Sequence, residues 1–262
     1  MKISINKINK IKGQKDEFNK IPMKKIIKNI TKCLVFPRRI ISKFISYIIS
    51  NIVSHRRGVI IYFHDPERLE VINLIRKIKN ETEMLLADNE AYQVFMLIKK
   101  TEKINGDIAE VGVYKGGSAK LICEAKGNKA LHLFDTFEGL PNLSNVDNPK
   151  QFHKGEFSVI FEDTKESLKE YSNVYFYKGL FPFTADPIKD KRFSFVHLDV
   201  DLYESTLNCL EFFYQRMNKG GIIISHNYID TPGVKKSFDD FFENKPEPII
   251  EMSGSQCLIV KL

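Results

Sequence analysis

A regular alternation of short apolar runs and helical patterns, beginning after residue 106, constrains the fold more than any other feature of the chain. Five runs rich in β-branched and aromatic residues predict strands at 107–113, 129–135, 174–178, 193–200 and 221–226. Helical patterns lie between or after them, at 117–126, 163–171, 204–218 and 233–243, and one precedes them at 84–103. Such alternation indicates βαβ units and a parallel sheet covered on both faces.

The C-terminal end of the chain follows a different pattern. Two apolar runs, 249–252 and 257–260, flank a turn at Ser253-Gly254-Ser255, which is typical of a β-hairpin. The last strand is therefore expected to be antiparallel. The four cysteines are widely spaced and form no C-x-x-C pair, so a disulfide framework and a thiolate zinc site are not expected.

The N-terminal quarter of the chain is strongly basic. Residues 1–60 carry 15 Lys and Arg but only Asp16 and Glu17, so the formal net charge of +7 resides in this segment. Within it, apolar residues recur at helical spacing over 40–54 and predict one amphipathic helix. We divide the chain into a basic helical extension, 1–75, and a main domain, 76–262.

Three partners are open for this extension. Clustered Lys and Arg favour phosphates or anionic lipid, and residues 24–57 could contact a membrane surface peripherally. The same helix could instead dock on its own domain or build a homo-oligomer. The apolar stretch is too short to cross a bilayer and no signal-peptide core is present, so we expect a cytoplasmic protein, alternatively one at the inner face of the membrane. A nucleic-acid partner is not expected.

A glycine-rich turn follows the first predicted strand, where ligands bind in open α/β sheets. Asp135 stands 23 residues beyond Gly112, about where an acid binds the hydroxyls of a ribose. A dinucleotide would require a small residue where the chain has Tyr114. We therefore favour S-adenosylmethionine, which has no pyrophosphate.

Polar side chains also collect at the end of the fourth predicted strand. His197, Asp199 and Asp201 alternate there and could share one face of the sheet if the strand extends that far. Asp201 could equally serve as an acid at the start of the following helix. Burying three polar side chains there would cost several kcal/mol without partners, so a ligand or other polar groups must satisfy them.

Four stretches, in the same order and spacing, carry a resemblance to a known family: EVGVYKGGS (110–118), FDTFEGLP (134–141), HLDVDLYEST (197–206) and GGIIISHNY (220–228). They resemble the macrocin O-methyltransferase family (TylF/MycF type), whose members methylate sugar hydroxyls of macrolides and related compounds. The resemblance covers roughly residues 80–262. It implies a Rossmann-like class I methyltransferase with a mostly parallel seven-stranded sheet and a C-terminal antiparallel hairpin, S-adenosylmethionine as methyl donor, and usually a divalent metal, commonly magnesium.

The resemblance also implies roles for individual residues. The cofactor-binding set is Glu110, Gly112, Gly117, Ser118, Asp135 and Phe137. In this set the first four shape the pocket for the methionine portion, Asp135 holds the ribose and Phe137 covers the adenine. Asp199 and His226 are the expected catalytic residues, and the long loop 141–160 is expected to contact the acceptor.

The chain departs from the family pattern at its expected metal site. Where the family has two consecutive Asp residues after the fifth strand, this chain has His226-Asn227. Losing two carboxylates weakens the attraction for magnesium. Two alternatives follow: Asp199, His226 and Asn227 hold Mg or Mn, which we favour narrowly, or the site works without metal and His226 is a general base.

The resulting hypothesis is an O-methyltransferase that acts on a sugar in a glycan or a glycosylated natural product, with a role in polysaccharide biosynthesis among those expected. Two other classes stay open from the sequence. One is an NAD-dependent oxidoreductase or epimerase of nucleotide sugars, and the other is a non-catalytic adaptor that keeps the fold while the basic extension binds the partner. The sequence names neither the acceptor nor the hydroxyl that is methylated.

Overall fold

The structure is a computed structural model, and it describes residues 65–262. The predicted helix over 40–54 and the predicted membrane or subunit contacts of residues 24–57 lie outside this range. The predicted domain boundary, between residues 75 and 76, falls inside helix α4 (Pro66–Glu81). Within 65–262, no helix is long and apolar enough to cross a membrane.

Seven strands form one twisted sheet in the order β3-β2-β1-β4-β5-β7-β6. The strands are β1 (Asp107–Val111), β2 (Leu131–Asp135), β3 (Val174–Lys178), β4 (Phe193–Leu198), β5 (Met217–Ser225), β6 (Ile250–Glu251) and β7 (Cys257–Val260). The first five are parallel, whereas β7 pairs antiparallel with β5 and β6 antiparallel with β7. The predicted α/β fold, with its antiparallel C-terminal end, is confirmed.

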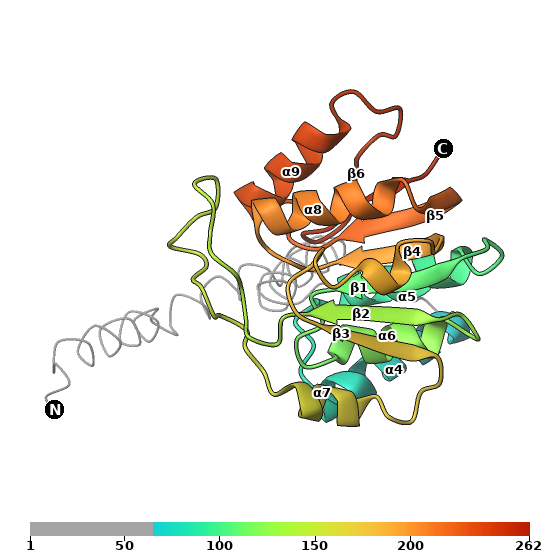
Figure 1. Ribbon diagram of the computed structural model, residues 1–262. Helices are drawn as coiled ribbons and strands as arrows, with labels where there is room; N and C mark the ends of the chain where they lie inside the picture. The colour runs from blue at the N-terminus through green and yellow to red at the C-terminus, as the bar shows by residue number, and fades with distance from the viewer. Residues whose placement is uncertain (1–64) are drawn as a thin grey trace, which may run out of the picture. The chain divides into compact units, whose positions relative to one another are not determined.

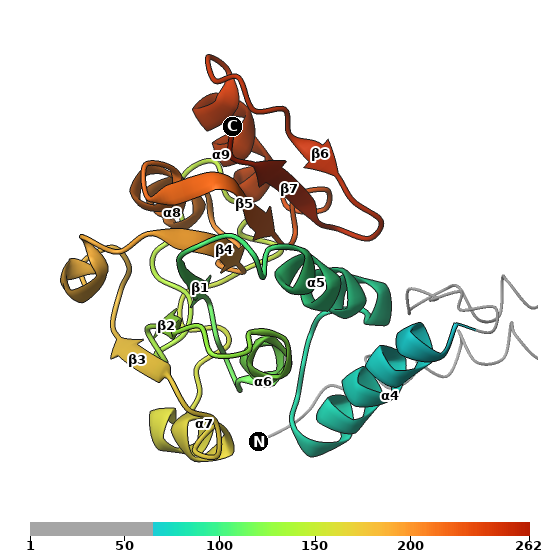
Figure 2. The same cartoon turned by 90° about the vertical axis from the view of Figure 1, so that its right-hand side faces the viewer.

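Helices cover both faces of the sheet (Figures 1 and 2). Helices α4, α5 (Asp88–Lys100) and α6 (Gly117–Ala125) bury apolar residues with one face. Helices α8 (Tyr203–Tyr214) and α9 (Pro232–Phe242) pack on the other face. Two short helices, α7 (Phe161–Ser167) and the 3₁₀ turn η1 (Asp186–Ile188), lie in the connections before and after β3.

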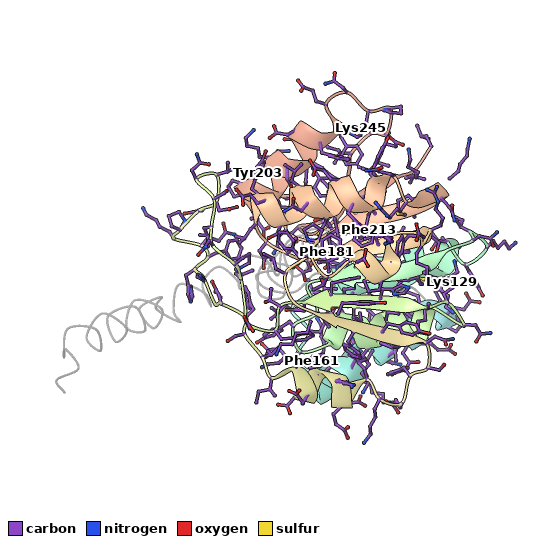
Figure 3. The ribbon with its side chains drawn as sticks, viewed as in Figure 1. Lys129, Phe161, Phe181, Tyr203, Phe213 and Lys245 are labelled. Carbon is purple, nitrogen blue, oxygen red and sulfur yellow. The ribbon has the colours of Figure 1, made fainter. Side chains whose placement is uncertain are left out.

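Aromatic side chains fill much of the second core. Phe181 stacks on Phe213 of α8 (Figure 3), with ring centroids 5.3 Å apart. Phe213 also meets Phe193 of β4 edge to face, with ring centroids 5.1 Å apart. Such pairs contribute about 0.5–1.5 kcal/mol each beyond the area that they bury. They fix the loop after β3 against α8, and this loop forms one wall of the cavity described below.

Two local differences from the predicted elements bear on the site. Helix α5 begins at Asp88, not at residue 84; residues 84–86 lie outside any helix or strand, and Met84 and Leu86 are buried. Helix α4 was not predicted from the sequence, although Ile72, Ile75 and Ile78 form its buried face at helical spacing.

Strand order reverses between β1 and β4, since β1 connects through β2 and β3 on one side and β4 leads to β5 on the other. Connections from neighbouring strands diverge at such a point and leave a crevice beyond the carboxyl ends of the strands. The residues singled out in the sequence follow β1, β2, β4 and β5, so the fold brings their loops to this crevice.

Candidate active site

A cavity opens at the switch point between β1 and β4. Its walls come from the glycine turn after β1, the ends of β2, β4 and β5, the segment before α5, and the loops after β2 and β3. The lining residues used below are Glu83, Met84, Gly112, Tyr114, Gly117, Ser118, Asp135, Phe152, Phe157, Asp199, Asp201, His226 and Asn227. One cavity thus joins the predicted cofactor turn and the predicted catalytic residues.

Glycines shape the turn after β1 because other chain segments press against it. A Cβ atom on Gly112, whose φ is +88°, would lie 1.9 Å from the backbone oxygen of Asp199. A Cβ on Gly117 would lie 2.5 Å from the oxygen of Glu83 and 2.6 Å from the Cβ of Met84. Gly112 therefore lets β1 and β4 approach at their ends, and Gly117 lets residues 83–84 close one side of the cavity.

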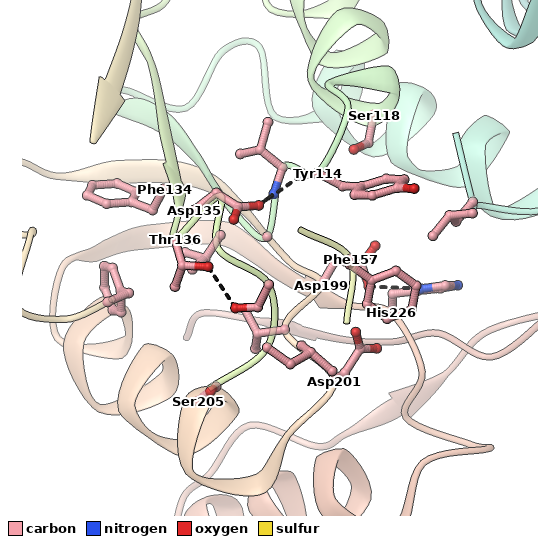
Figure 4. Close-up of a pocket in the computed structure, with 18 of the residues that line it drawn as sticks. Tyr114, Ser118, Phe134, Asp135, Thr136, Phe157, Asp199, Asp201, Ser205 and His226 are labelled. Carbon is pink, nitrogen blue, oxygen red and sulfur yellow. Dashed lines mark hydrogen bonds and ion pairs between the residues drawn. The ribbon is translucent and has the colours of Figure 1, made fainter. Parts of the chain in front are cut away.

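Asp135 ties the glycine turn to the end of β2 (Figure 4). Its Oδ2 accepts hydrogen bonds from the backbone N–H groups of Val113 at 2.7 Å and Tyr114 at 2.8 Å. Its Oδ1 accepts one from Phe137 at 2.7 Å. An ionised carboxylate has about four acceptor positions, so about one remains on Oδ1. The carboxylate is thereby fixed beside Gly112, as the sequence predicts.

The other predicted cofactor residues lie in different surroundings. Ser118 lines the cavity at the start of α6. Glu110 lies beneath the cavity floor, fully buried, where its Oε1 is 2.9 Å from Nδ1 of His197, and burial raises its pKa. Phe137 packs on Phe161, with ring centroids 4.8 Å apart, and is not part of the cavity lining. The structure thus places Gly112, Gly117, Ser118 and Asp135 at the cavity, and Glu110 and Phe137 behind its walls.

Strand β4 ends at Leu198, so the side chains of 197, 199 and 201 do not share one surface. His197 pairs with Glu110 in the core, whereas Asp199 and Asp201 line the cavity. Asp201 has a φ of +59°, a left-handed conformation that Asp and Asn adopt more readily than most residues. The turn that follows the strand, rather than strand alternation, sets the direction of these two carboxylates.

His226 follows β5 and lies between two carboxylates. Its Nδ1 is 3.0 Å from Oδ1 of Asp199, the contact drawn in Figure 4, and its Nε2 is 3.3 Å from Oε2 of Glu90. Next to it Asn227, with a φ of +60°, donates a hydrogen bond from its side-chain nitrogen to Oδ1 of Asp201. The turns after β4 and β5 are therefore joined by two side-chain pairs.

Glu90 was missed in the sequence. It lies in the first turn of α5, is 5% exposed, and accepts hydrogen bonds from the backbone N–H of Ala87 and from the N–H and hydroxyl of Ser255. The only local signal is an acid in the first turn of a helix, which usually serves as a cap. Its contacts with Ser255 and His226 are far apart in sequence, and only the folded sheet brings them together.

The charges in this group follow from its contacts. Burial acts to lower the pKa of His226, but the charges of Asp199 and Glu90 and the hydrogen bonds to them raise it to about 11. Burial acts to raise the pKa of Glu90, but hydrogen bonds from His226 and Ser255 lower it to about 2. His226 likewise outweighs burial at Asp199 and lowers its pKa. At neutral pH the ring is thus a cation between two anions.

Asp201 behaves differently from Asp199. Burial and the neighbouring charge of Asp199 raise the pKa of Asp201 to about 7, against the effect of the hydrogen bond from Asn227. One carboxylate of the pair is therefore ionised near neutral pH, and the other is close to its midpoint.

The predicted metal set, Asp199, His226 and Asn227, does not fit a divalent cation. A metal-bound imidazole must offer a nitrogen lone pair, and both nitrogens of His226 face carboxylate oxygens. The side-chain nitrogen of Asn227 is turned toward Asp201. Across residues 65–262, no group of three or more His, Cys, Asp or Glu side chains could hold a metal ion. The geometry therefore does not support the prediction of Mg or Mn at these residues.

The loop after β2 forms the outer wall of the cavity. Phe152 and Phe157 line the cavity from it, and Phe157 meets Tyr114 edge to face at 5.8 Å. Asp147 anchors the loop, because its Oδ1 accepts the N–H of Tyr203 at the start of α8 and its Oδ2 accepts the N–H and hydroxyl of Ser144. Phe152 and Phe157 therefore form an aromatic part of the cavity wall.

Comparison with known proteins bears on this arrangement. The family model described as macrocin O-methyltransferase (TylF) matches residues 91–255, which include the glycine turn, Asp135, Asp199 and His226. The chain belongs to the macrocin O-methyltransferase family. The family assignment made from the four sequence stretches is confirmed.

Two curated relatives in Streptomyces are similar to this member of the family. One, from Streptomyces olivaceus, is 8-demethyl-8-(2,3-dimethoxy-alpha-L-rhamnosyl)-tetracenomycin-C 4'-O-methyltransferase, 31% identical over 156 residues, or 54% of this chain and 59% of the relative. The other, demethyldecarbamoylnovobiocin O-methyltransferase from Streptomyces niveus, is 25% identical over 153 residues, or 53% of this chain and 58% of the relative. The chain thus matches less than two thirds of the length of either relative.

Solved structures agree on the fold of this macrocin O-methyltransferase family member. The O-methyltransferase NovP has a TM-score of 0.62 at 16% identity, over 74% of this chain and 98% of its own. The calicheamicin methyltransferase CalS11 has a TM-score of 0.57 at 19% identity, over 76% and 95%. An O-methyltransferase from Bacillus cereus, solved in complex with SAH, has a TM-score of 0.50 at 13% identity, over 83% and 97%. The class I methyltransferase fold is therefore shown.

Proposed function

We propose that this protein transfers a methyl group from S-adenosylmethionine to a hydroxyl group of a sugar, in a glycan or a glycosylated natural product. The observation that carries the proposal is the single cavity in which the Asp135-bound glycine turn and the Asp199–His226 pair meet. Membership of the macrocin O-methyltransferase family supports it, and the Streptomyces olivaceus relative is named for methylation of a rhamnosyl group.

The residues around the glycine turn fit S-adenosylmethionine. Asp135 has about one acceptor position left on Oδ1, which would take a ribose hydroxyl. Met84 lies against Gly117, where a Cβ atom would clash with it. Gly117 and Ser118, at the start of α6, both line the cavity and would face the bound cofactor. When bound, S-adenosylmethionine supplies an electrophilic methyl group attached to a sulfonium.

Asp199 is the base in this proposal. Its Oδ1 contacts His226, so we assign Oδ2 to the acceptor hydroxyl. Asp199 accepts the hydroxyl proton as the acceptor oxygen bonds to the methyl carbon and the carbon–sulfur bond breaks. The positive ring of His226 holds the Asp199 carboxylate in place and offsets the negative charge that develops on the acceptor oxygen. No step is assigned to a divalent cation, because the residues do not fit one.

Binding and turnover test the proposal separately. Titration calorimetry with S-adenosylmethionine should show one site per chain, and transfer of a radiolabelled methyl group to a panel of deoxy-sugar and lipopolysaccharide acceptors should identify a product. Asp199→Asn should lower kcat by about 10²–10⁴-fold and leave the Kd for S-adenosylmethionine within about twofold. Asp186→Asn, the same change at an exposed ion pair with Lys189, is the matched control and should behave as wild type.

Three results would contradict the proposal. Absence of S-adenosylmethionine binding would overturn it, and binding of NAD in its place would favour an oxidoreductase. An Asp199→Asn variant that turns over like the wild type would remove Asp199 from the reaction.

A further inference from the structure

The place where the sequence predicts a metal holds a built array of three side chains. Glu90, His226 and Asp199 come from the start of α5, the end of β5 and the end of β4, and their side chains are 6%, 12% and 21% exposed. The ring of His226 contacts one carboxylate through each nitrogen, at 3.3 Å and 3.0 Å. The array is therefore a bridge between two anions, made by one imidazole.

This geometry leaves the ring with no electron pair for a metal. An imidazole nitrogen is either a donor that carries hydrogen or an acceptor with a lone pair. An ionised carboxylate oxygen can only accept, so each nitrogen of His226 that faces one must donate. A divalent ion could bind this ring only after breaking one of the two contacts and expelling a proton.

Hydrogen bonds from Ala87 and Ser255 hold the Glu90 carboxylate of the array in place. Glu90 accepts the N–H groups of Ala87 and Ser255 at 2.8 Å and 2.7 Å, besides the hydroxyl of Ser255 at 2.8 Å. Gly254, with a φ of +100°, lets the turn before β7 close on it, because a Cβ there would lie 2.5 Å from Oε1 of Glu90. Glu90 is thus fixed before any ligand arrives, and it holds one side of the His226 ring in place.

We propose that the side chain of His226, clamped between Glu90 and Asp199, occupies the position of a divalent cation, and that the site binds no Mg²⁺ or Mn²⁺. The ring provides a fixed positive group beside Asp199 without metal coordination. Asn227 completes the arrangement, because it is neutral and binds Asp201 through its nitrogen. That this ring assists methyl transfer rests on the proposed function, whereas the lack of a metal site does not.

Metal titration of the full-length protein tests this inference without measuring turnover. Mn²⁺ binding is followed by electron paramagnetic resonance and by calorimetry, with SAH present at saturation. The wild type should show no saturable Mn²⁺ site at millimolar concentration. The double variant His226→Asp/Asn227→Asp, which removes the ring and adds two carboxylates, should gain one site with affinity about tenfold or more above any binding by wild type.

The matched control is His153→Asp, a histidine to aspartate change at an exposed ring that contacts Glu156. It should gain no site. Thermal unfolding of each variant shows whether it is folded before titration. If the double variant is unfolded, two other experiments take its place: Mn²⁺ titration of Asn227→Asp alone, and a methyl-transfer assay of wild type in EDTA. Asn227→Asp should also gain no tight site because the His226 ring remains, and turnover in EDTA should be unchanged.

Two outcomes would overturn the inference. One equivalent of Mn²⁺ bound by wild type at micromolar concentration, and lost in Asp199→Asn, would show that the metal site exists. A folded double variant that binds no Mn²⁺ would show that His226 does not occupy a cation position. Failure of the proposed function gives a different result, since the wild type would then not bind S-adenosylmethionine, whatever the outcome with metal.

Discussion

The charged ring of His226 makes the stability of the fold depend on pH, and a His226→Gln variant should lose this dependence. The pKa of the ring is about 6.5 in an unfolded chain and about 11 in the folded protein. Because the folded-state value is raised, the stabilisation is complete below pH 6.5 and is lost as the pH rises through 11. Between these values the folded state holds one proton more than the unfolded state.

The slope follows directly from this extra proton. The free energy of unfolding should fall by about 1.4 kcal/mol per pH unit, so the contribution of His226 should shrink by about 2.7 kcal/mol between pH 7.5 and 9.5. Buried cysteines such as Cys209, whose pKa is also raised by burial, add to the slope of the whole protein in this range. The quantity to compare is therefore the difference between wild type and variant, in which such groups cancel.

Urea unfolding at half-unit steps from pH 7.5 to 9.5, followed by circular dichroism, measures this difference. The variant should be less stable than wild type at pH 7.5 by about 3–5 kcal/mol, since two buried carboxylates lose their cation. The difference in the free energy of unfolding between the two proteins should shrink by about 1.4 kcal/mol per pH unit as the pH rises. Parallel curves for the two proteins would refute the argument, because they would show that the ring is neutral in the folded state.

Three further predictions concern the turn, the cofactor and the loop. Gly112→Ala should lower the free energy of unfolding by more than about 3 kcal/mol, because its Cβ would overlap the backbone of Asp199. Gly127→Ala, at a φ of +59° with open space around it, should lower it by only about 1–2 kcal/mol, and thermal unfolding compares the two variants. Asp135→Asn should weaken S-adenosylmethionine binding by about 10–100-fold in calorimetry, since the amide loses charge and must turn its nitrogen toward backbone donors; unchanged affinity would move the ribose elsewhere. Asp147→Ala should release the loop after β2 from the start of α8, so the KM for the acceptor should rise while the Kd for S-adenosylmethionine stays unchanged. An equal rise in this KM and this Kd would assign the loop to the cofactor.

The fold could be predicted in most of its parts because its signals are local. Strand β3 occupies the predicted residues 174–178, and β1, β2 and β4 differ from prediction by two residues at one end. Where the predicted elements differ from the observed ones, contacts between segments far apart in the sequence determine the local structure. Residues 84–86 have an apolar composition that suits a helix, but Met84 lies against Gly117 and Leu86 is buried, and these residues stay outside helix α5.

The site residues also differ in how far the sequence could predict them. Asp199 and His226 could be placed together from the sequence because each follows one of two neighbouring parallel strands, and such ends meet at one edge of a sheet. Glu90 could not, since its partners are His226 and Ser255, and nothing near residue 90 points to them. Without Glu90, one nitrogen of His226 looks available to a metal or to a proton, which is why the sequence left both alternatives open.

Glu90 also explains how the His226-Asn227 pair is compatible with the proposed reaction. The metal site that the sequence resemblance implies, with three carboxylates and a divalent cation, would carry one net negative charge. The array of Glu90, His226 and Asp199, with the ring protonated, carries the same net charge. Burying two anions without a cation would cost several kcal/mol, so replacing a metal by an imidazole requires that the ring stay charged, and a second carboxylate at its far nitrogen ensures this. The loss of two acidic ligands after β5 and the presence of a buried acid at the start of α5 are therefore parts of one arrangement, and a change at either position alone should be more damaging than the coordinated change of both.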